Sequence, residues 1–198
     1  KSVTISSVVK ELRKTYENLF FENFDIKPFF VDHTFDFGFE IEYFPPENCG
    51  SDRLVAAFAG VYKYKTPVIV CDLGTATNIE VVTSENKYVG GIITPGINTF
   101  ADALFEKTSK LPKVELAKPA NVIGNSTVSS IQSGIYFGYI GLVDGIVERI
   151  IGELNEEPKV IATGGFADLI AEESKYLQII EKNLVLEGLN LIAKKKSG

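Results

Sequence analysis

Short β-rich runs alternate with amphipathic helical runs along the chain, and this alternation restricts the fold more than any other feature of the sequence. Apolar and period-two runs predict strands at residues 3–9, 27–31, 35–43, 68–71, 77–82, 88–93, 160–162 and 176–180. Helical spacing predicts helices at residues 9–20, 51–64, 98–108, 128–154, 166–174 and 185–195. A strand meander followed by helix–strand repeats predicts an α/β fold in which helices cover a sheet.

A domain boundary is expected near residue 66, because Pro67 separates a helix from the strand meander. Residues 66–198 are predicted to form a complete α/β unit, and residues 1–65 the carboxyl-terminal part of a first unit. The sequence contains no methionine and begins inside a strand-like run. We therefore expect that the beginning of the first unit is missing from this chain.

Composition and charge favour a globular protein that acts on small molecules. Hydrophobic residues make up 45% of the 198 residues and charged residues 23%, as in ordinary globular domains. The net charge of −6 is opposite in sign to the basic surface of most nucleic-acid-binding proteins. No apolar run approaches the roughly 20 residues of a membrane-spanning helix. We therefore expect neither a nucleic acid nor a membrane as a partner.

The remaining special residues suggest little chemistry. Cys49 and Cys71 lack metal-ligand spacing and are expected to be free thiols in a reducing cytoplasm. The single histidine, His33, has no chemical partner near it in the sequence and is expected to have no functional role. The basic run Lys194–Lys196 predicts a solvated end of the last helix.

The segment Cys71–Thr77 is a candidate phosphate site. A strand delivers Asp72, a Gly74-Thr75 turn follows, and a second strand leaves. Glycine allows a phosphate to approach the backbone, and turn N–H groups and Thr hydroxyls donate to its oxygens. Asp72 at the strand end suits a cation or its water shell. The alternative is a plain hairpin turn in which Asp72 bonds to its own backbone.

The segment Gly50–Arg53 is a candidate substrate site at the start of a helix. Ser51 is a suitable N-cap, and Asp52 in the first turn complements the helix dipole. A cation at a helix start is unfavourable, so Arg53 has no such local explanation. A carboxylate here can accept a proton from an attacking hydroxyl, and a guanidinium can bind an anionic substrate group.

Two further motifs carry weaker signals. The strand at 160–162 ends in Gly164-Gly165 before a helix, which places N–H groups at a sheet edge that ligands favour; close packing of strand against helix explains it equally well. A polar segment, 124–127, is expected to cap a long helix with Thr127 just inside it. The glycines of this helix clear one face for close helix packing, at Gly134, Gly138 and Gly141.

Taken together, these segments resemble the type III pantothenate kinases, of the actin-like and sugar-kinase ATPase superfamily. Tyr43 lies seven residues before Gly50, as the family's substrate-contacting Tyr lies before its Gly-x-Asp-Arg motif. Residues 72–77 resemble the family's second phosphate motif. Other family motifs follow in the same order, at residues 5–9, 90–97, 103–105, 110–112, 132–134, 141–145 and 162–165. This ordered series covers nearly the whole chain and is a specific signal.

The resemblance implies a fold, a reaction and an assembly. The fold is two ribonuclease-H-like domains with a cleft between them, the first incomplete in this chain. The reaction is the ATP-dependent phosphorylation of pantothenate to 4'-phosphopantothenate, the first step of coenzyme A biosynthesis. The implied assembly is a cytoplasmic homodimer that uses ATP with Mg²⁺ and a monovalent cation, K⁺ or NH₄⁺.

The resemblance also assigns roles to residues. Asp52 is implied as the proton acceptor for the pantothenate hydroxyl, and Asp72 as the ligand of the monovalent cation. The residues implied to bind pantothenate are Tyr43, Gly50, Ser51, Asp52, Arg53 and Thr127. The residues implied to bind ATP are Gly74, Thr75, Gly164 and Gly165.

The sequence departs from the family pattern in its first phosphate loop, because no Asp-x-Gly-Asn-Thr segment is present. Losing half of the phosphate clamp is expected to cost several kcal/mol of transition-state stabilisation. Either the segment precedes this chain in the natural protein, or the chain is a non-catalytic, transcription-accessory relative of the kinase. A structural α/β domain with incidental turns is the third alternative. The enzyme is favoured because a set of site residues is retained, namely Tyr43, Asp52, Arg53, Asp72 and Thr127.

Overall fold

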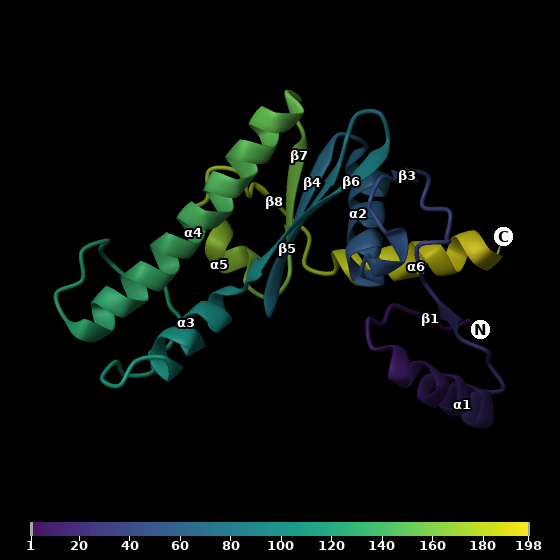
Figure 1. The fold of residues 1–198 in the computed structure, drawn as a ribbon, viewed down its shortest axis with the longest axis horizontal. Helices are drawn as coiled ribbons and strands as arrows, with labels where there is room; N and C mark the ends of the chain where they lie inside the picture. The colour runs from purple at the N-terminus through teal and green to yellow at the C-terminus, as the bar shows by residue number, and fades with distance from the viewer. Residues whose placement is uncertain (1, 198) are drawn as a thin grey trace. The chain divides into compact units, whose positions relative to one another are not determined.

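The computed structural model describes residues 2–197, which form a mixed α/β fold as predicted (Figure 1). Its strands are β1 (Thr4–Ile5), β2 (Phe29–Phe30), β3 (Glu40–Ile41), β4 (Val68–Leu73), β5 (Ala76–Val82), β6 (Lys87–Pro95), β7 (Lys159–Thr163) and β8 (Ile179–Ile180). Its α-helices are α1 (Arg13–Phe24), α2 (Ser51–Tyr64), α3 (Ile97–Glu106), α4 (Thr127–Leu154), α5 (Ala167–Ala171) and α6 (Leu184–Ser197). Two short 3₁₀ helices, η1 (Lys10–Leu12) and η2 (Pro46–Asn48), precede α1 and α2. Within the described residues no helix is long and apolar enough to cross a bilayer.

The predicted meander forms the middle of a six-stranded sheet with the order β3-β6-β5-β4-β7-β8. Short turns join β4 to β5 and β5 to β6, a connection that only antiparallel neighbours allow. The outer strands are parallel to their neighbours, with Ile41 opposite Tyr88 on one side and Ile161 opposite Ile179 on the other. The first four residues of β4 are fully buried, as a central strand covered on both faces requires.

Contacts divide the chain into two compact units, each built from separate stretches of sequence. The first unit holds residues up to 68, residues 80–90 and residues from 183 onward. In this unit β1 and β2 form a parallel pair and α2 packs against α6. Its core contains α2 and a group of aromatic rings, in which Phe37 lies 5.0 Å from Phe35 and 5.9 Å from Phe58.

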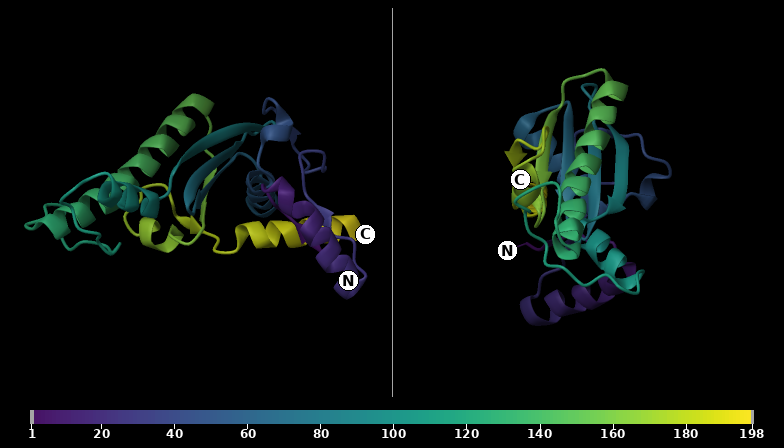
Figure 2. Two further views of the ribbon diagram at one scale, coloured as in Figure 1. Left: turned by 60° about the horizontal axis from the view of Figure 1, so that its bottom comes forward. Right: turned by 90° about the vertical axis from the view of Figure 1, so that its left-hand side faces the viewer.

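The second unit holds residues 69–79 and 91–182. Its longest element is α4, which the side chain of Ser126 caps by accepting a hydrogen bond from Ser129 N, in a capping box with the Ser129 hydroxyl. This confirms that a polar residue in 124–127 caps the long helix. Figure 2 shows α3 beside the amino-terminal half of α4, and α5 lies against β7.

The structure corrects several predicted strands of the first unit. The strand expected at 35–43 is reduced to β3, and the one at 3–9 to β1. The alternating aromatic residues of 35–39 instead form turns. The Asp32 carboxylate accepts from Thr34 N at 2.9 Å, the Asp36 carboxylate accepts from Gly38 N at 3.0 Å, and Gly38 has a φ of +79°. Asp side chains therefore satisfy backbone donors that a strand ladder would otherwise hold.

Candidate functional site

The amino end of α2 brings together the residues expected to handle the substrate. Oδ1 of Asp52 accepts a hydrogen bond from Arg53 N at 2.9 Å. The same oxygen lies 2.5 Å from the position that a Cβ atom would take on Gly50. Only glycine therefore leaves room for Asp52 to fold back over the first turn of the helix.

The expectation that Ser51 caps α2 was wrong. Gly50 occupies the N-cap position without a side-chain cap, and Ser51 is the first helical residue. The Ser51 hydroxyl is buried and hydrogen-bonds to the Ser6 hydroxyl at 2.7 Å. Because its side chain points to the segment after β1, Ser51 joins two stretches of the first unit instead of serving its own helix.

Arg53 takes part in a buried ion pair. Its Nε donates to Oε1 of Glu80 at 2.6 Å and its Nη2 donates to Oε2 at 2.9 Å. Only 7% of Arg53 and 1% of Glu80 is exposed. Burial disfavours the Arg53 cation, but the hydrogen bonds and charge of Glu80 outweigh burial and raise the pKa of Arg53.

Tyr43 covers the guanidinium of Arg53. The Arg53 Cζ atom lies 5.4 Å from the centroid of the Tyr43 ring, within the range of a cation–π interaction. A Cβ atom on Gly90, which has a φ of +96°, would lie only 3.1 Å from Cδ2 of Tyr43. The structure therefore brings Tyr43, Gly50, Asp52 and Arg53 together in the first unit.

A second cluster forms at the end of β4, where Gly164 approaches Asp72. Gly164 has a φ of +93°, and a Cβ atom there would lie 2.7 Å from both Asp72 Oδ1 and Leu73 O. Phe166 N donates to Leu73 O at 3.3 Å. The candidate phosphate site at residues 71–77 and the Gly164-Gly165 motif, distant in sequence, thus lie side by side in the second unit.

The Gly74-Thr75 turn is held from the β6–α3 junction. Thr75 O accepts from Gly96 N at 3.0 Å and from the Thr99 hydroxyl at 2.9 Å. A Cβ atom on Gly96 would collide with the Gly74 carbonyl oxygen. Thr75 itself is exposed, beside a backbone that these hydrogen bonds hold in place.

The side-chain and backbone acceptors at the end of β4 are oxygen atoms, which suit a hard cation better than a soft, thiophilic one. A carboxylate oxygen of Asp72 and the carbonyl oxygen of Leu73 converge on one point beside Gly164, and hard cations prefer such oxygen ligands. Among residues 2–197 no three His, Cys, Asp or Glu side chains are grouped as a metal site.

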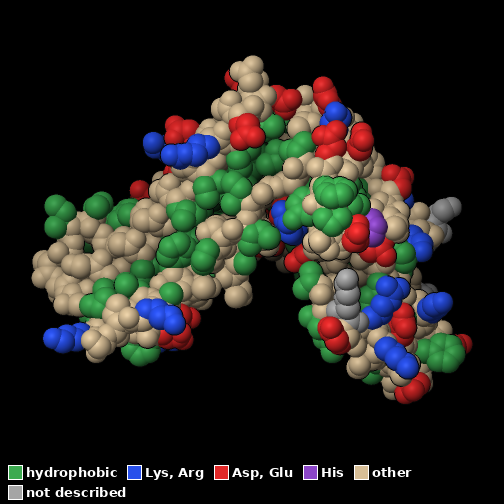
Figure 3. All heavy atoms as spheres, in the orientation of Figure 1, with side chains coloured by type: hydrophobic (Ala, Val, Ile, Leu, Met, Phe, Trp, Pro, Cys, Tyr) green, Lys and Arg blue, Asp and Glu red, His purple; other side chains and the backbone are tan. Residues whose placement is uncertain are grey.

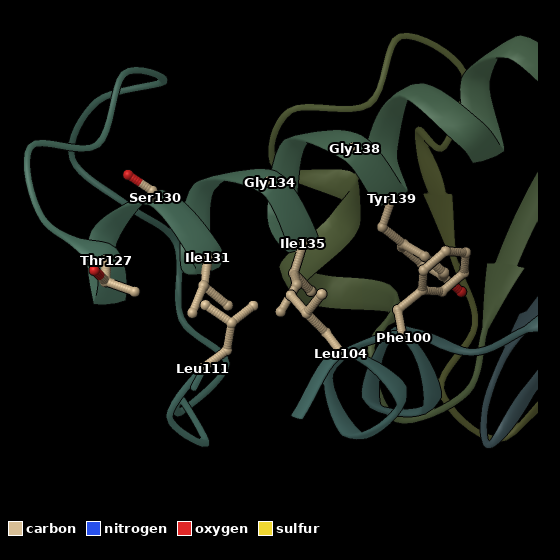
Figure 4. A pocket seen from close by; sticks show the side chains of 10 residues that line it. All are labelled: Phe100, Leu104, Leu111, Thr127, Ser130, Ile131, Gly134, Ile135, Gly138 and Tyr139. Atoms are coloured by element: carbon tan, nitrogen blue, oxygen red, sulfur yellow. The ribbon is translucent and has the colours of Figure 1, made fainter. Parts of the chain in front are cut away.

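Thr127 is the first residue of α4 and is exposed. It lines a cavity of about 680 Å³ between α3 and α4 (Figure 4). Figure 4 shows Thr127 at one end of this lining, and Phe100 beside Tyr139 at the other. The remaining lining residues are Leu104, Leu111, Ser130, Ile131, Gly134, Ile135 and Gly138. Figure 3 shows hydrophobic side chains gathered over α3 and the adjoining turns of α4.

A second cavity, of about 590 Å³, lies in the first unit beside the start of α2. It is lined by residues of the β1–η1 segment, of the start of α1, of the segment after β2 and of the η2–α2 junction, including Ser7, Arg13, His33, Cys49, Gly50 and Ser51. Two of the residues expected to contact substrate therefore border open space.

The family model and the curated relatives agree on one family. The family model described as type III pantothenate kinase matches residues 1–149. Curated type III pantothenate kinases of Citrifermentans bemidjiense and of a Geobacter species are each 48% identical over 192 residues, covering 97% of this chain and 76% of the relative. The enzyme of Geotalea daltonii is 47% identical, over 96% of this chain and 74% of its own length.

The chain belongs to the type III pantothenate kinase family. The crystal structure of a protein described as a Baf family transcriptional activator from Campylobacter jejuni aligns with all of this chain and 84% of its own, with a TM-score of 0.66. At 20% identity, that likeness shows the fold alone.

For a type III pantothenate kinase, the structure adds site neighbours that sequence reasoning missed. Glu80 and Tyr88 lie under Arg53, and Gly96 and Thr99 hold the Thr75 turn. One signal was available for Glu80, since an acidic residue within the apolar strand run Ile79–Val82 must be either exposed or paired.

Proposed function

We propose that this protein transfers the γ-phosphoryl group of ATP to pantothenate and so forms 4'-phosphopantothenate in the first step of coenzyme A biosynthesis. The observation that carries the proposal is the 48% identity to curated type III pantothenate kinases over 97% of the chain. Such similarity over most of both proteins extends through the substrate and phosphate motifs and not only through the fold.

Asp52 is proposed as the proton acceptor for the pantothenate hydroxyl. Its position in the first turn of α2 supports this role, because the helix dipole favours a carboxylate there. The hydrogen bond from Arg53 N fixes one of its oxygens. A positioned carboxylate of this kind removes the hydroxyl proton as the oxygen attacks phosphorus.

Tyr43, Gly50, Ser51, Arg53 and Thr127 are proposed to bind pantothenate together with Asp52. Arg53 supplies positive charge for the substrate carboxylate, and Tyr43 supplies an apolar face next to it. The cavity beside Gly50 and Ser51 supplies space. Thr127 belongs to the other compact unit, so its share in the substrate site rests on the family pattern.

Gly74, Thr75, Gly164 and Gly165 are proposed to bind ATP, with Asp72 holding K⁺ or NH₄⁺. The close approach of Gly164 to Asp72 supports this, because it joins residues 72–77 and the Gly164-Gly165 motif at one sheet edge. Mg²⁺ bound with the ATP phosphates would neutralise charge that develops during transfer. In this proposal the Gly74-Thr75 turn and the Asp72 carboxylate act by positioning ATP and the cation.

The proposal extends to the architecture and assembly. It includes two ribonuclease-H-like domains with a cleft between them, with the boundary near residue 66, and a cytoplasmic homodimer with neither nucleic acid nor membrane as partner. The open glycine face of α4 supports the dimer, since nothing lies within 4 Å of a Cβ atom on Gly134, Gly138 or Gly141. Both cysteines are free thiols, which suits a reducing compartment.

The test is a transfer assay with the full-length protein. Purified protein is incubated with pantothenate, Mg-ATP and KCl, and 4'-phosphopantothenate is measured by mass spectrometry. We expect product only when all components are present, and less product when KCl is replaced by choline chloride. Absence of product, together with absence of pantothenate binding in calorimetry, would contradict the proposed function.

A further inference from the structure

Glu80 is a buried carboxylate whose role the proposed reaction does not explain. It sits on β5 with 1% of its surface exposed, and an unpaired charge at that depth is strongly unfavourable. Its two oxygens receive three donors: Arg53 Nε on Oε1, and Arg53 Nη2 with the Tyr88 hydroxyl on Oε2. Three donors therefore hold the carboxylate in place, and its burial keeps it out of reach of a ligand.

The hydrogen bonds around Glu80 have a defined direction. Tyr88 has a single hydroxyl hydrogen and donates it to Glu80 at 2.5 Å. The contact of 3.3 Å between Cys49 Sγ and the Tyr88 oxygen must then run from the thiol to the tyrosine. Cys49, the residue before Gly50, thus donates to Tyr88, and Tyr88 donates to Glu80. Arg53 donates to the same carboxylate.

This arrangement restricts what Arg53 can do. Glu80 uses two of the three guanidinium nitrogens, Nε and Nη2, in one fork. Nη1 is the nitrogen that Glu80 leaves to another partner. The Tyr43 ring packs 5.4 Å from Cζ and limits rotation of the guanidinium plane. The orientation of the Arg53 guanidinium is therefore fixed by its hydrogen bonds to Glu80 and by its packing against the Tyr43 ring.

We propose that Glu80 is a positioning residue for substrate recognition: it fixes the guanidinium of Arg53 so that its remaining edge meets the carboxylate of pantothenate, and it does not touch the substrate. This inference rests on the proposed function, because it takes Arg53 as the ligand of that carboxylate. Ion pairing through a rigid fork gives orientation as well as charge. The competing interpretation is that the pair only stabilises the first unit.

The main experiment separates binding from turnover in Glu80→Gln, which keeps the shape of the side chain and removes its charge. In the full-length enzyme we expect KM for pantothenate to rise about tenfold, the lower end of the loss found when the outer hydrogen-bond partner of a metal-ligating residue is removed. KM for ATP and kcat should change much less. An unchanged KM for pantothenate in a folded Glu80→Gln enzyme would overturn the inference.

A double-mutant cycle tests that Glu80 acts through Arg53. In an Arg53→Gln background, Glu80→Gln should raise KM for pantothenate no further, because the group that Glu80 orients is gone. A full additional rise in that background would show that Glu80 acts independently of Arg53, and the inference would fail.

Two matched variants exclude a mere loss of stability. Asp144 is the other buried carboxylate among the described residues and accepts from the Ser174 hydroxyl at 2.5 Å and from Lys175 N at 3.0 Å. Asp144→Asn should lower Tm yet leave KM for pantothenate unchanged. Tyr88→Phe removes one donor to Glu80 without leaving a cavity, so it decides the question if Glu80→Gln does not fold; it should raise KM in the same direction by a smaller factor.

A spectroscopic readout keeps this inference distinct from the proposed function. The Arg53 Nε–H resonance, assigned by its loss in Arg53→Lys, should exchange slowly with solvent in the unliganded wild type and rapidly in Glu80→Gln. Fast exchange in the wild type would overturn the inference. If the wild type shows slow exchange but never phosphorylates pantothenate, the proposed function fails, and with it the part of the inference that names the substrate.

Discussion

Oδ1 of Asp72 lies 2.7 Å from the point where a Cβ atom would sit on Gly164. A real Cβ atom does not approach another heavy atom this closely without a shift of the structure. Only glycine, which has no Cβ atom, therefore fits next to this carboxylate. The φ of +93° at Gly164 imposes the same choice independently. This contact couples the strand end that carries Asp72 to the loop that follows β7.

Gly164→Ala is therefore expected to damage ATP binding. The new methyl group must displace Asp72 or the backbone at Leu73, and the left-handed conformation adds about 1–3 kcal/mol of strain. We expect KM for ATP to rise about tenfold, if about half of that energy appears in binding, with a lower Tm. The matched control is Gly152→Ala in α4, where nothing lies within 4 Å of the added atom. A Gly164→Ala enzyme with a normal KM for ATP would contradict the placement of Gly164 at the nucleotide.

Asp52→Asn tests the proton acceptor. The amide keeps the size of the carboxylate but cannot take a proton, so turnover should fall by roughly 10²–10⁴ while pantothenate affinity changes much less. If Asp52 serves only the helix dipole, the change should cost about 0.3–1 kcal/mol of stability and leave turnover nearly intact. Turnover, pantothenate affinity and Tm measured on one preparation distinguish the two results. Asp72→Asn is the comparison and should weaken activation by K⁺ without removing the base.

Gly138→Leu tests the proposed dimer face of α4. Gly138 is exposed and an added Cβ atom would meet nothing within 4 Å, so the single chain has room for a side chain at this position. Against a closely packed second copy, the larger side chain should cost about 1–3 kcal/mol, or about 5- to 150-fold in the dimer dissociation constant. Sedimentation at several concentrations measures this, with Gly152→Leu as control. Equal dimerisation of both variants, or a monomeric wild type, would argue against an interface on this face.

Cys49 is expected to resist alkylation in the native protein. Burial raises the pKa of its thiol above the ordinary value, and this effect outweighs the lowering by the nearby Arg53 charge. The reactive thiolate is thus scarce at pH 8 in the folded state and more abundant in the unfolded chain. By linkage, this group's contribution to stability falls as pH rises through the thiol range, because the unfolded chain releases the proton first. Iodoacetamide labelling followed by peptide mass spectrometry, with and without denaturant, measures Cys49 separately from Cys71, and rapid native labelling of Cys49 would contradict this expectation.

The sequence by itself determined the elements whose signals are local. Helical spacing placed α2 at the observed bounds and α4 to within one residue, and turn residues separated the three meander strands. Ser126 capped α4 within the polar segment expected to do so. These features depend on residues at most a few positions apart, so a short stretch of sequence is enough to predict them. The same holds for the ordered motifs that place the chain in its family.

Only the tertiary structure decided which residues meet. Arg53 had no local reason to stand at a helix start, and its partner, Glu80, lies 27 residues further on another element. Asp72 and Gly164 were predicted as separate motifs and become neighbours because β4 and β7 are adjacent strands. In residues 35–39 a period-two pattern predicted a strand, but Asp32 and Asp36 capture backbone donors and packing of Phe37 fixes turns instead. Such pairings depend on the order of the strands and on burial. Segments far apart in the chain determine both, so a short stretch of sequence cannot predict which residues meet.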